Sequence, residues 1–104
     1  MQRVLAVTSL PDSAIEASAA FFADYLLEAR SILREGESDA LAIILPPAPR
    51  DHDDWRRALA RDLARESAPK RVNVIGGAGE GLDETLAYLG NAPGVTGQYC
   101  PLHE

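Results

Sequence analysis

The stretch RVNVIGGAGEG at residues 71–81 leads an apolar segment into a glycine-rich turn, and LDETLAYL follows with a helical pattern. Strand, glycines and helix in this order are how dinucleotide-binding proteins hold a pyrophosphate. The spacing argues against that chemistry here, because the pattern would require a further glycine where Leu82 stands. Glu80 also places a negative charge where phosphate would lie, so a flexible turn before a helix is favoured. The glycines that could contact a cofactor are Gly76, Gly77, Gly79 and Gly81.

Two other clusters contain metal-binding or nucleophilic groups. Residues 51–54 read Asp-His-Asp-Asp, but neighbouring residues at a helix start point in different directions, which favours helix capping over a metal site. Cys100 and His103 have a metal-like spacing but supply two ligands, whereas zinc sites need three or four. Without an adjacent base or helix N-terminus, Cys100 is expected to be a packed thiol. The sequence therefore predicts no catalytic residues, no metal site and no cofactor.

Basic residues form a row on the second predicted helix. Arg57, Arg61 and Arg65 follow one another at intervals of four residues, a spacing that could receive an acidic partner. Asp53 precedes Arg57 by four residues, so the row is interpreted as a solvated helix face with ion pairs along it.

Composition limits the classes of protein to consider. The chain has 104 residues, of which 46% are hydrophobic and 25% charged, as expected for one globular domain. Its net charge of −6 disfavours nucleic acid and acidic membrane surfaces as partners. The single cysteine excludes an internal disulfide, and no apolar run reaches the ~20 residues of a membrane helix. We therefore expect a cytoplasmic protein.

Strand-like and helix-like segments alternate along the chain. ALAIIL at residues 40–45 is apolar without alternation, which is typical of a strand buried on both faces. Ser13 and Glu16 have the spacing of a capping box at the start of a helix. The β-α-β-α-β-α-β order predicts a single truncated Rossmann-like α/β domain over residues 1–104, three-layered, with a mostly parallel sheet of about four strands. The predicted strands are 4–7, 40–45, 71–75 and 95–101, and the predicted helices are 13–34, 54–67 and 82–89.

The second half of the chain resembles the C-terminal part of short-chain dehydrogenases/reductases. In that family a Leu-Ala-x-Glu-x-Ala-Pro-like phrase precedes Arg-Val-Asn on a strand, and Thr-Gly-Gln later opens the last strand. Residues 3–45 resemble the preceding strand, helix and strand, so the chain would be the family's second half. The alternative is that its first strand descends from the family's first strand, with the middle deleted. The residues that match in order are Leu63, Ala64, Glu66, Ala68, Pro69, Arg71, Val72, Asn73, Thr96, Gly97 and Gln98.

The sequence departs from this family at its functional positions. The family's Gly-x-x-x-Gly-x-Gly cofactor turn follows its first strand, but the first glycine here is Gly36. Counting back along the match places the family's catalytic Tyr near Pro49 and its Lys near Asp53. Proline has no acidic hydroxyl, and aspartate has the wrong charge to lower the pKa of a neighbouring tyrosine. The resemblance therefore predicts a catalytically degenerate member.

The expected fold also suggests how such a protein could act. Successive right-handed crossovers would place the first two predicted helices on one face of the sheet and leave only the short third helix on the other. In the related family the corresponding two helices build a four-helix dimer interface. Within residues 13–34 one face carries Ile15, Ala19, Phe22, Leu26 and Leu33, and Phe21, Tyr25 and Ile32 widen this apolar arc. An arc this broad suggests two contacts, such as the sheet and a second helix. The interface candidates are Phe21, Tyr25, Ile32, Trp55 and Leu59.

We therefore expect a non-catalytic protein that forms a homodimer or another homo-oligomer, or that acts as an accessory subunit of a full-length relative. The alternative is a module that binds a nucleotide or a small ligand in the crevice at the C-terminal ends of the strands. That crevice would lie near Thr8, Pro46 and residues 76–81.

Overall fold

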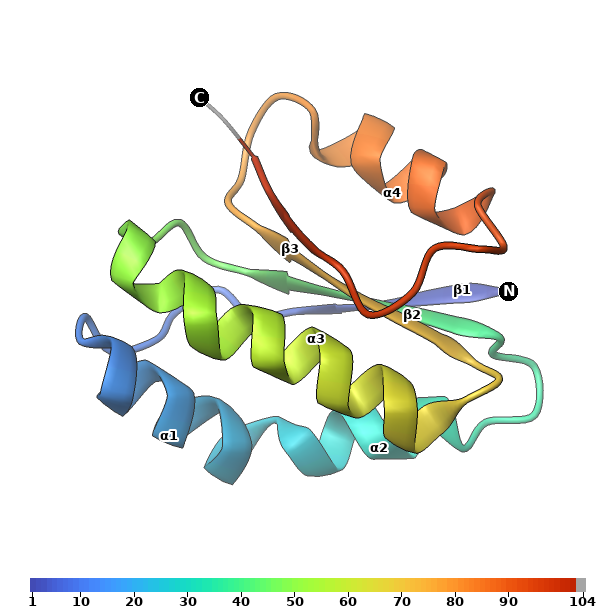
Figure 1. Cartoon of the computed structure of the whole chain (residues 1–104), viewed down its shortest axis with the longest axis horizontal. Coiled ribbons are helices and arrows are strands. Elements are labelled where there is room, and N and C mark those ends of the chain that lie inside the picture. The colour runs from blue at the N-terminus through green and yellow to red at the C-terminus, as the bar shows by residue number, and fades with distance from the viewer. Residues whose placement is uncertain (103–104) are drawn as a thin grey trace.

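The fold is a four-stranded parallel sheet covered by helices, as the α/β prediction required (Figure 1). The computed structural model describes residues 1–102. Within them the strands lie in the order β1-β2-β3-β4, and all three neighbouring pairs are parallel. The elements are β1 (Gln2–Ala6), α1 (Ala14–Asp24), α2 (Leu26–Leu33), β2 (Ala40–Leu45), the 3-10 turn η1 (Arg50–His52), α3 (Asp53–Ser67), β3 (Arg71–Gly76), α4 (Leu82–Gly90) and β4 (Tyr99–Pro101).

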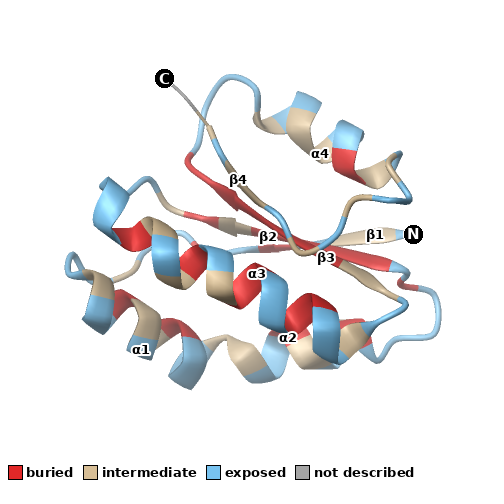
Figure 2. Cartoon of the chain, in the orientation of Figure 1, coloured by how far each residue is buried: buried red, intermediate tan, exposed pale blue. Residues whose placement is uncertain are grey.

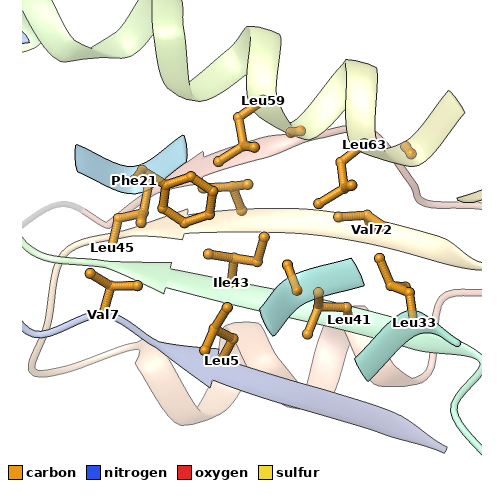
Figure 3. Packing of buried hydrophobic residues seen from close by; sticks show 14 residues of the cluster. Leu5, Val7, Phe21, Leu33, Leu41, Ile43, Leu45, Leu59, Leu63 and Val72 are labelled. Atoms are coloured by element: carbon orange, nitrogen blue, oxygen red, sulfur yellow. The ribbon is translucent and has the colours of Figure 1, made fainter. Parts of the chain in front are cut away.

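The strand β2 is buried on both faces because its residues alternate between two cores. Leu41, Ile43 and Leu45 point into the larger core, which also contains Val72 and Val74 from β3 (Figure 3). Ala42 points to the opposite face and packs with Ile75 and Leu89 in a smaller core. The unbroken apolar run of β2 is thus explained by two covered faces.

The helices are divided unequally between the two faces of the sheet. The helices α1, α2 and α3 cover one face and α4 alone covers the other, as predicted from the crossovers (Figures 1 and 2). The strand β1 lies at the edge of the sheet. Its Val4, on the face that α4 covers, is 45% exposed, whereas Leu5, which points to the opposite face, is buried. The short α4 therefore leaves part of its face of the sheet uncovered at β1.

The first helical segment is not the continuous helix predicted over residues 13–34. It begins as predicted, with the backbone N–H of Glu16 donating to the hydroxyl of Ser13 at 3.1 Å, but it is interrupted at Tyr25, where φ is −124° and ψ is −18°. The buried residues are Ala17 and Phe21 before the break and Ala29 and Leu33 after it. In a regular helix Ala29 and Leu33 would lie roughly 80–120° around the axis from Phe21. The break at Tyr25 allows the buried residues of both helices to face the sheet.

The apolar face predicted for the first half of this segment is exposed at three positions. Ile15 is 83% exposed, Phe22 is 45% exposed and Ala19 is also exposed, because Ala17 and Phe21 occupy the side of α1 that faces the sheet. The last strand is also shorter than the predicted 95–101, since residues 95–98 contact β3 through a mixture of side-chain and backbone hydrogen bonds and the β3–β4 ladder begins only at Tyr99.

Candidate functional site

A crevice opens at the C-terminal ends of β2 and β3, where open parallel sheets usually hold ligands. Its volume is about 380 Å³, and its walls come from the loop after β2, the start of α3, the end of β3 and β4. The apolar part of its lining includes Pro47, Ala48 and Leu102, and the charged part consists of Arg50, Asp53 and Arg56. A crevice that combines apolar walls with a few fixed charged groups can hold a small organic ligand.

Arg56 is the central charged group of this crevice. Its side chain is 1% exposed, although it carries a full positive charge. One terminal nitrogen, Nη2, donates to the carbonyl oxygen of Pro46 at 2.8 Å, and Nη1 donates to the hydroxyl of Tyr99 at 3.2 Å. The guanidinium carbon lies 5.5 Å from the ring centre of Trp55 and 5.9 Å from that of Tyr99. These contacts fix the guanidinium in place at the inner end of the crevice.

The guanidinium of Arg56 keeps unused hydrogen-bonding capacity. Its buried Nε has no hydrogen-bond partner, and none of the ion pairs among residues 1–102 involves Arg56. A guanidinium has five N–H donors, so several remain for another acceptor. Arg56 was not predicted from the sequence. The available signal was its position three residues before Leu59 and seven before Leu63, which places its charged side chain on the buried side of α3.

Gly76 shapes the crevice by admitting the ring of Tyr99. A Cβ atom at position 76 would lie 2.2 Å from the Tyr99 hydroxyl oxygen, so only glycine lets this ring reach Arg56. Gly77, Gly79 and Gly81 have φ values of 116°, 92° and 89°, which glycine adopts without strain. The backbone N–H of Gly77 is already donated to the carbonyl of Leu45 at 3.0 Å. The glycines thus serve packing and turn formation, in line with the turn that the sequence favoured.

The acidic cluster at residues 51–54 does not converge on one point. His52 is 2% exposed, and its Nδ1 accepts a hydrogen bond from the indole N–H of Trp55 at 3.3 Å. Its Nε2 therefore carries the proton and donates to the carbonyl of Asp12 at 2.9 Å. Within residues 1–102, no group of three His, Cys, Asp or Glu side chains is arranged to hold a metal ion. The ring of His52 ties the loop after β1 to the start of α3.

Cys100 packs against the smaller core beneath α4, and burial raises the pKa of its thiol. The protonated form is therefore favoured, and a thiol is a poor nucleophile in that form. His103, which the sequence paired with Cys100 as a possible second metal ligand, lies outside the described residues.

The arginine row lies along a separate groove of about 570 Å³ between α3 and residues 96–99. Arg57, Arg61 and Arg65 all line this groove, and Arg57 lies 3.8 Å from Asp53 and 3.7 Å from Asp54. The arginines are exposed, as expected for a solvated helix face.

The residues that carry the family resemblance hold β3 to the segment before β4. Asn73, 2% exposed, donates from its amide to the carbonyl of Val95 at 3.0 Å and accepts from the backbone N–H of Gln98 at 3.1 Å. The hydroxyl of Thr96 accepts from the backbone N–H of Val72 at 3.0 Å. The backbone N–H of Gly97 donates to the carbonyl of Val72 at 2.7 Å. The residues that match the family therefore connect β3 to the segment before β4 by hydrogen bonds.

Comparison with protein-family models decides the ancestry. Residues 5–102 match the family described as short chain dehydrogenase-like protein. The chain belongs to this short-chain-dehydrogenase-like family. Searches of curated proteins and of solved structures found no significant match. In this family member, the positions where the resemblance put the catalytic Tyr and Lys, Pro49 and Asp53, lie just before Arg56, and Asp53 lines the Arg56 crevice.

The predicted interface residues divide between the core and its margin. Phe21 and Leu59 are 0% and 2% exposed and pack inside the larger core, so their side chains are not available to a partner (Figure 3). Tyr25, Ile32 and Trp55 are half-buried at the margin of that core. The large exposed apolar residues of α1 and α2 are instead Ile15, Phe22 and Leu27.

Proposed function

We propose that this short-chain-dehydrogenase-like protein is non-catalytic and acts as a homodimer that associates through the outer surface of α1, α2 and α3. The observation that carries the proposal is the exposure of large apolar side chains on this surface. Ile15 is 83% exposed, Phe22 45% and Leu27 76%. Ile15 and Phe22 are seven residues apart on α1 and therefore project from the same side of that helix.

A shallow groove beside Phe22 also favours an interface on this surface. The groove lies between the α1–α2 pair and α3, and its apolar lining includes Leu26 and Leu63. Arg30 and Glu66 form its rim, joined by two hydrogen bonds of 2.6 and 2.9 Å. These hydrogen bonds and the positive charge of Arg30 lower the pKa of Glu66. An apolar centre with a charged rim is the usual construction of a protein interface.

The choice of a second copy as the partner follows from the family resemblance. The corresponding two helices form a four-helix dimer interface in short-chain dehydrogenases/reductases, and α1 and α2 here carry exposed large apolar side chains. The loss of catalysis is supported by Pro49 and Asp53 at the expected Tyr and Lys positions. No helix within residues 1–102 is long and apolar enough to cross a membrane.

Measuring the solution mass of paired variants tests the interface. Sedimentation velocity should give a dimer for the wild type and a folded monomer for Phe22→Asp, because the introduced carboxylate cannot be buried between two copies. Tyr88→Asp is the matched control, since Tyr88 is an exposed aromatic residue on α4, on the opposite face. A monomeric wild type, or a Tyr88→Asp variant that dissociates while Phe22→Asp stays dimeric, would contradict the proposal.

Thermal unfolding with nicotinamide dinucleotides tests the absence of catalysis. A ligand at ~100 times its dissociation constant adds roughly 2.7 kcal/mol to the free energy of unfolding. We expect no stabilisation by NAD, NADH, NADP or NADPH, because the cofactor turn of the family has no counterpart before Gly36. A clear rise in the melting temperature with one of these four nucleotides would argue against a non-catalytic protein.

A further inference from the structure

We propose that the crevice around Arg56 binds a small organic acid with one carboxylate, which the buried guanidinium recognises. The site lies at the ends of β2 and β3 and so is a second surface, apart from the proposed dimer surface on the outer side of α1, α2 and α3.

Burying the positive charge of Arg56 without a carboxylate partner lowers the stability of the folded protein. Removing a guanidinium from water is offset only by strong hydrogen bonds or an opposite charge. Arg56 has two neutral acceptors, the carbonyl of Pro46 and the hydroxyl of Tyr99, and its Nε has none. The neighbouring core positions on α3, Leu59 and Leu63, show that an apolar residue would suit this side of the helix. A bound carboxylate would supply the missing charge.

The crevice offers space for an organic body next to this cation. Arg56 lies between two hollows, the crevice of about 380 Å³ beside Tyr99 and a smaller one of about 200 Å³ beside His52. In the smaller hollow His52 is already held by the carbonyl of Asp12. The larger crevice has Pro47 and Leu102 as apolar walls, which suit a short aliphatic or aromatic group.

The surrounding charges favour a single carboxylate over a phosphate. Asp53 lines the same crevice and would repel a dianion more strongly than a monoanion. The net charge of −6 acts in the same direction. The backbone N–H of Gly77, which could otherwise donate to a phosphate, is already donated to the carbonyl of Leu45. Arg50, exposed at the crevice, adds a second positive charge that can attract a monoanion.

The test is an NMR titration of the whole protein with three carboxylates, acetate, butyrate and benzoate, at constant ionic strength. Benzamide is the neutral control for benzoate, and inorganic phosphate tests the other oxyanion. We expect at least one carboxylate to cause saturable amide shifts at Gly76, Gly77 and Tyr99, and neither benzamide nor phosphate to do so. Saturable shifts with phosphate alone, equal shifts with benzamide, or no saturable shift with any of the three carboxylates would overturn the proposal.

Paired arginine variants assign the binding to one side chain. Arg56→Met should weaken binding of the active carboxylate by about tenfold or more, since a charge-assisted hydrogen bond is lost. Arg57→Met is the matched control, because Arg57 is the next residue and lines the other groove; it should bind within about twofold of the wild type, as an exposed charge contributes little. If Arg56→Met does not fold, Arg56→Lys serves, and its loss of the planar fork should still weaken binding. Undiminished binding in the folded Arg56 variant would overturn the assignment.

Discussion

Replacing Gly76 by alanine tests the packing that builds the Arg56 crevice. The new Cβ would lie 2.2 Å from the Tyr99 hydroxyl oxygen and 2.8 and 2.9 Å from two atoms of its ring. Either the ring moves and loses the 3.2 Å hydrogen bond from Arg56, or β3 shifts within a sheet that is paired on both sides. Overpacking of this kind costs about 1–3 kcal/mol, so we expect the free energy of unfolding to fall by about 2 kcal/mol.

A double-mutant cycle with Tyr99→Ala separates this clash from any other effect of the substitution. All three close contacts belong to the Tyr99 side chain, so its removal leaves the alanine methyl group without them. In that background Gly76→Ala should be neutral or stabilise by about 0.5–1 kcal/mol, because glycine is unfavourable within a strand. Urea unfolding followed by the fluorescence of Trp55, the single tryptophan, measures each corner of the cycle.

Gly94→Ala is the control for the cycle. An added Cβ at position 94 has no atom within 4 Å, so the free energy of unfolding should stay within about 0.5 kcal/mol of the wild type. The reasoning would be refuted if Gly76→Ala were as mild as this control, or if it cost the same with and without the ring of Tyr99.

Three further predictions concern the core, a helix cap and the thiol. Phe21→Ala should lower the free energy of unfolding by about 3–5 kcal/mol in urea titrations, because the ring is 0% exposed; a loss under about 1 kcal/mol would contradict its burial. Ser13→Ala should cost about 1 kcal/mol, which calorimetry would record as a melting temperature lower by about 4–8 °C, and an unchanged value would argue against the cap. Burial raises the pKa of Cys100 in the folded state, so the unfolded thiol releases its proton first. The free energy of unfolding should therefore decline as the pH rises above about 8.5, and comparison with Cys100→Ala should show that this decline is smaller without the thiol.

Local pattern was sufficient for the order and type of the elements. The run of residues 40–45 predicted β2 with its observed bounds, since a strand covered on both faces requires apolar residues at every position. The crossovers then placed α1–α2 and α3 on the same face, as observed (Figure 1). The ordered phrase from Leu63 to Gln98 indicated the family that the comparison of residues 5–102 supports.

The candidate site was less accessible to sequence reasoning. The glycines after β3 drew attention as possible phosphate contacts, whereas Gly76 proved to be a packing position opposite Tyr99. Arg56 was overlooked, because the arginines at positions 57, 61 and 65 formed the visible row. Its importance depends on two distant partners, the carbonyl of Pro46 and the hydroxyl of Tyr99, ten and 43 residues away along the chain.

The sequence by itself thus determined the α/β architecture, the ancestry and the absence of the family's Tyr and Lys at their expected positions, because these depend on residue type and local periodicity. Tertiary structure decided which apolar side chains are exposed to solvent and which charged side chain is buried. Phe21 packs in the core and Phe22 is exposed, although the two are neighbours, and the break at Tyr25 lets α2 present Ala29 and Leu33 to the same core. Burial depends on how helix and sheet surfaces meet, and a rotation of one helix by less than a turn reverses it.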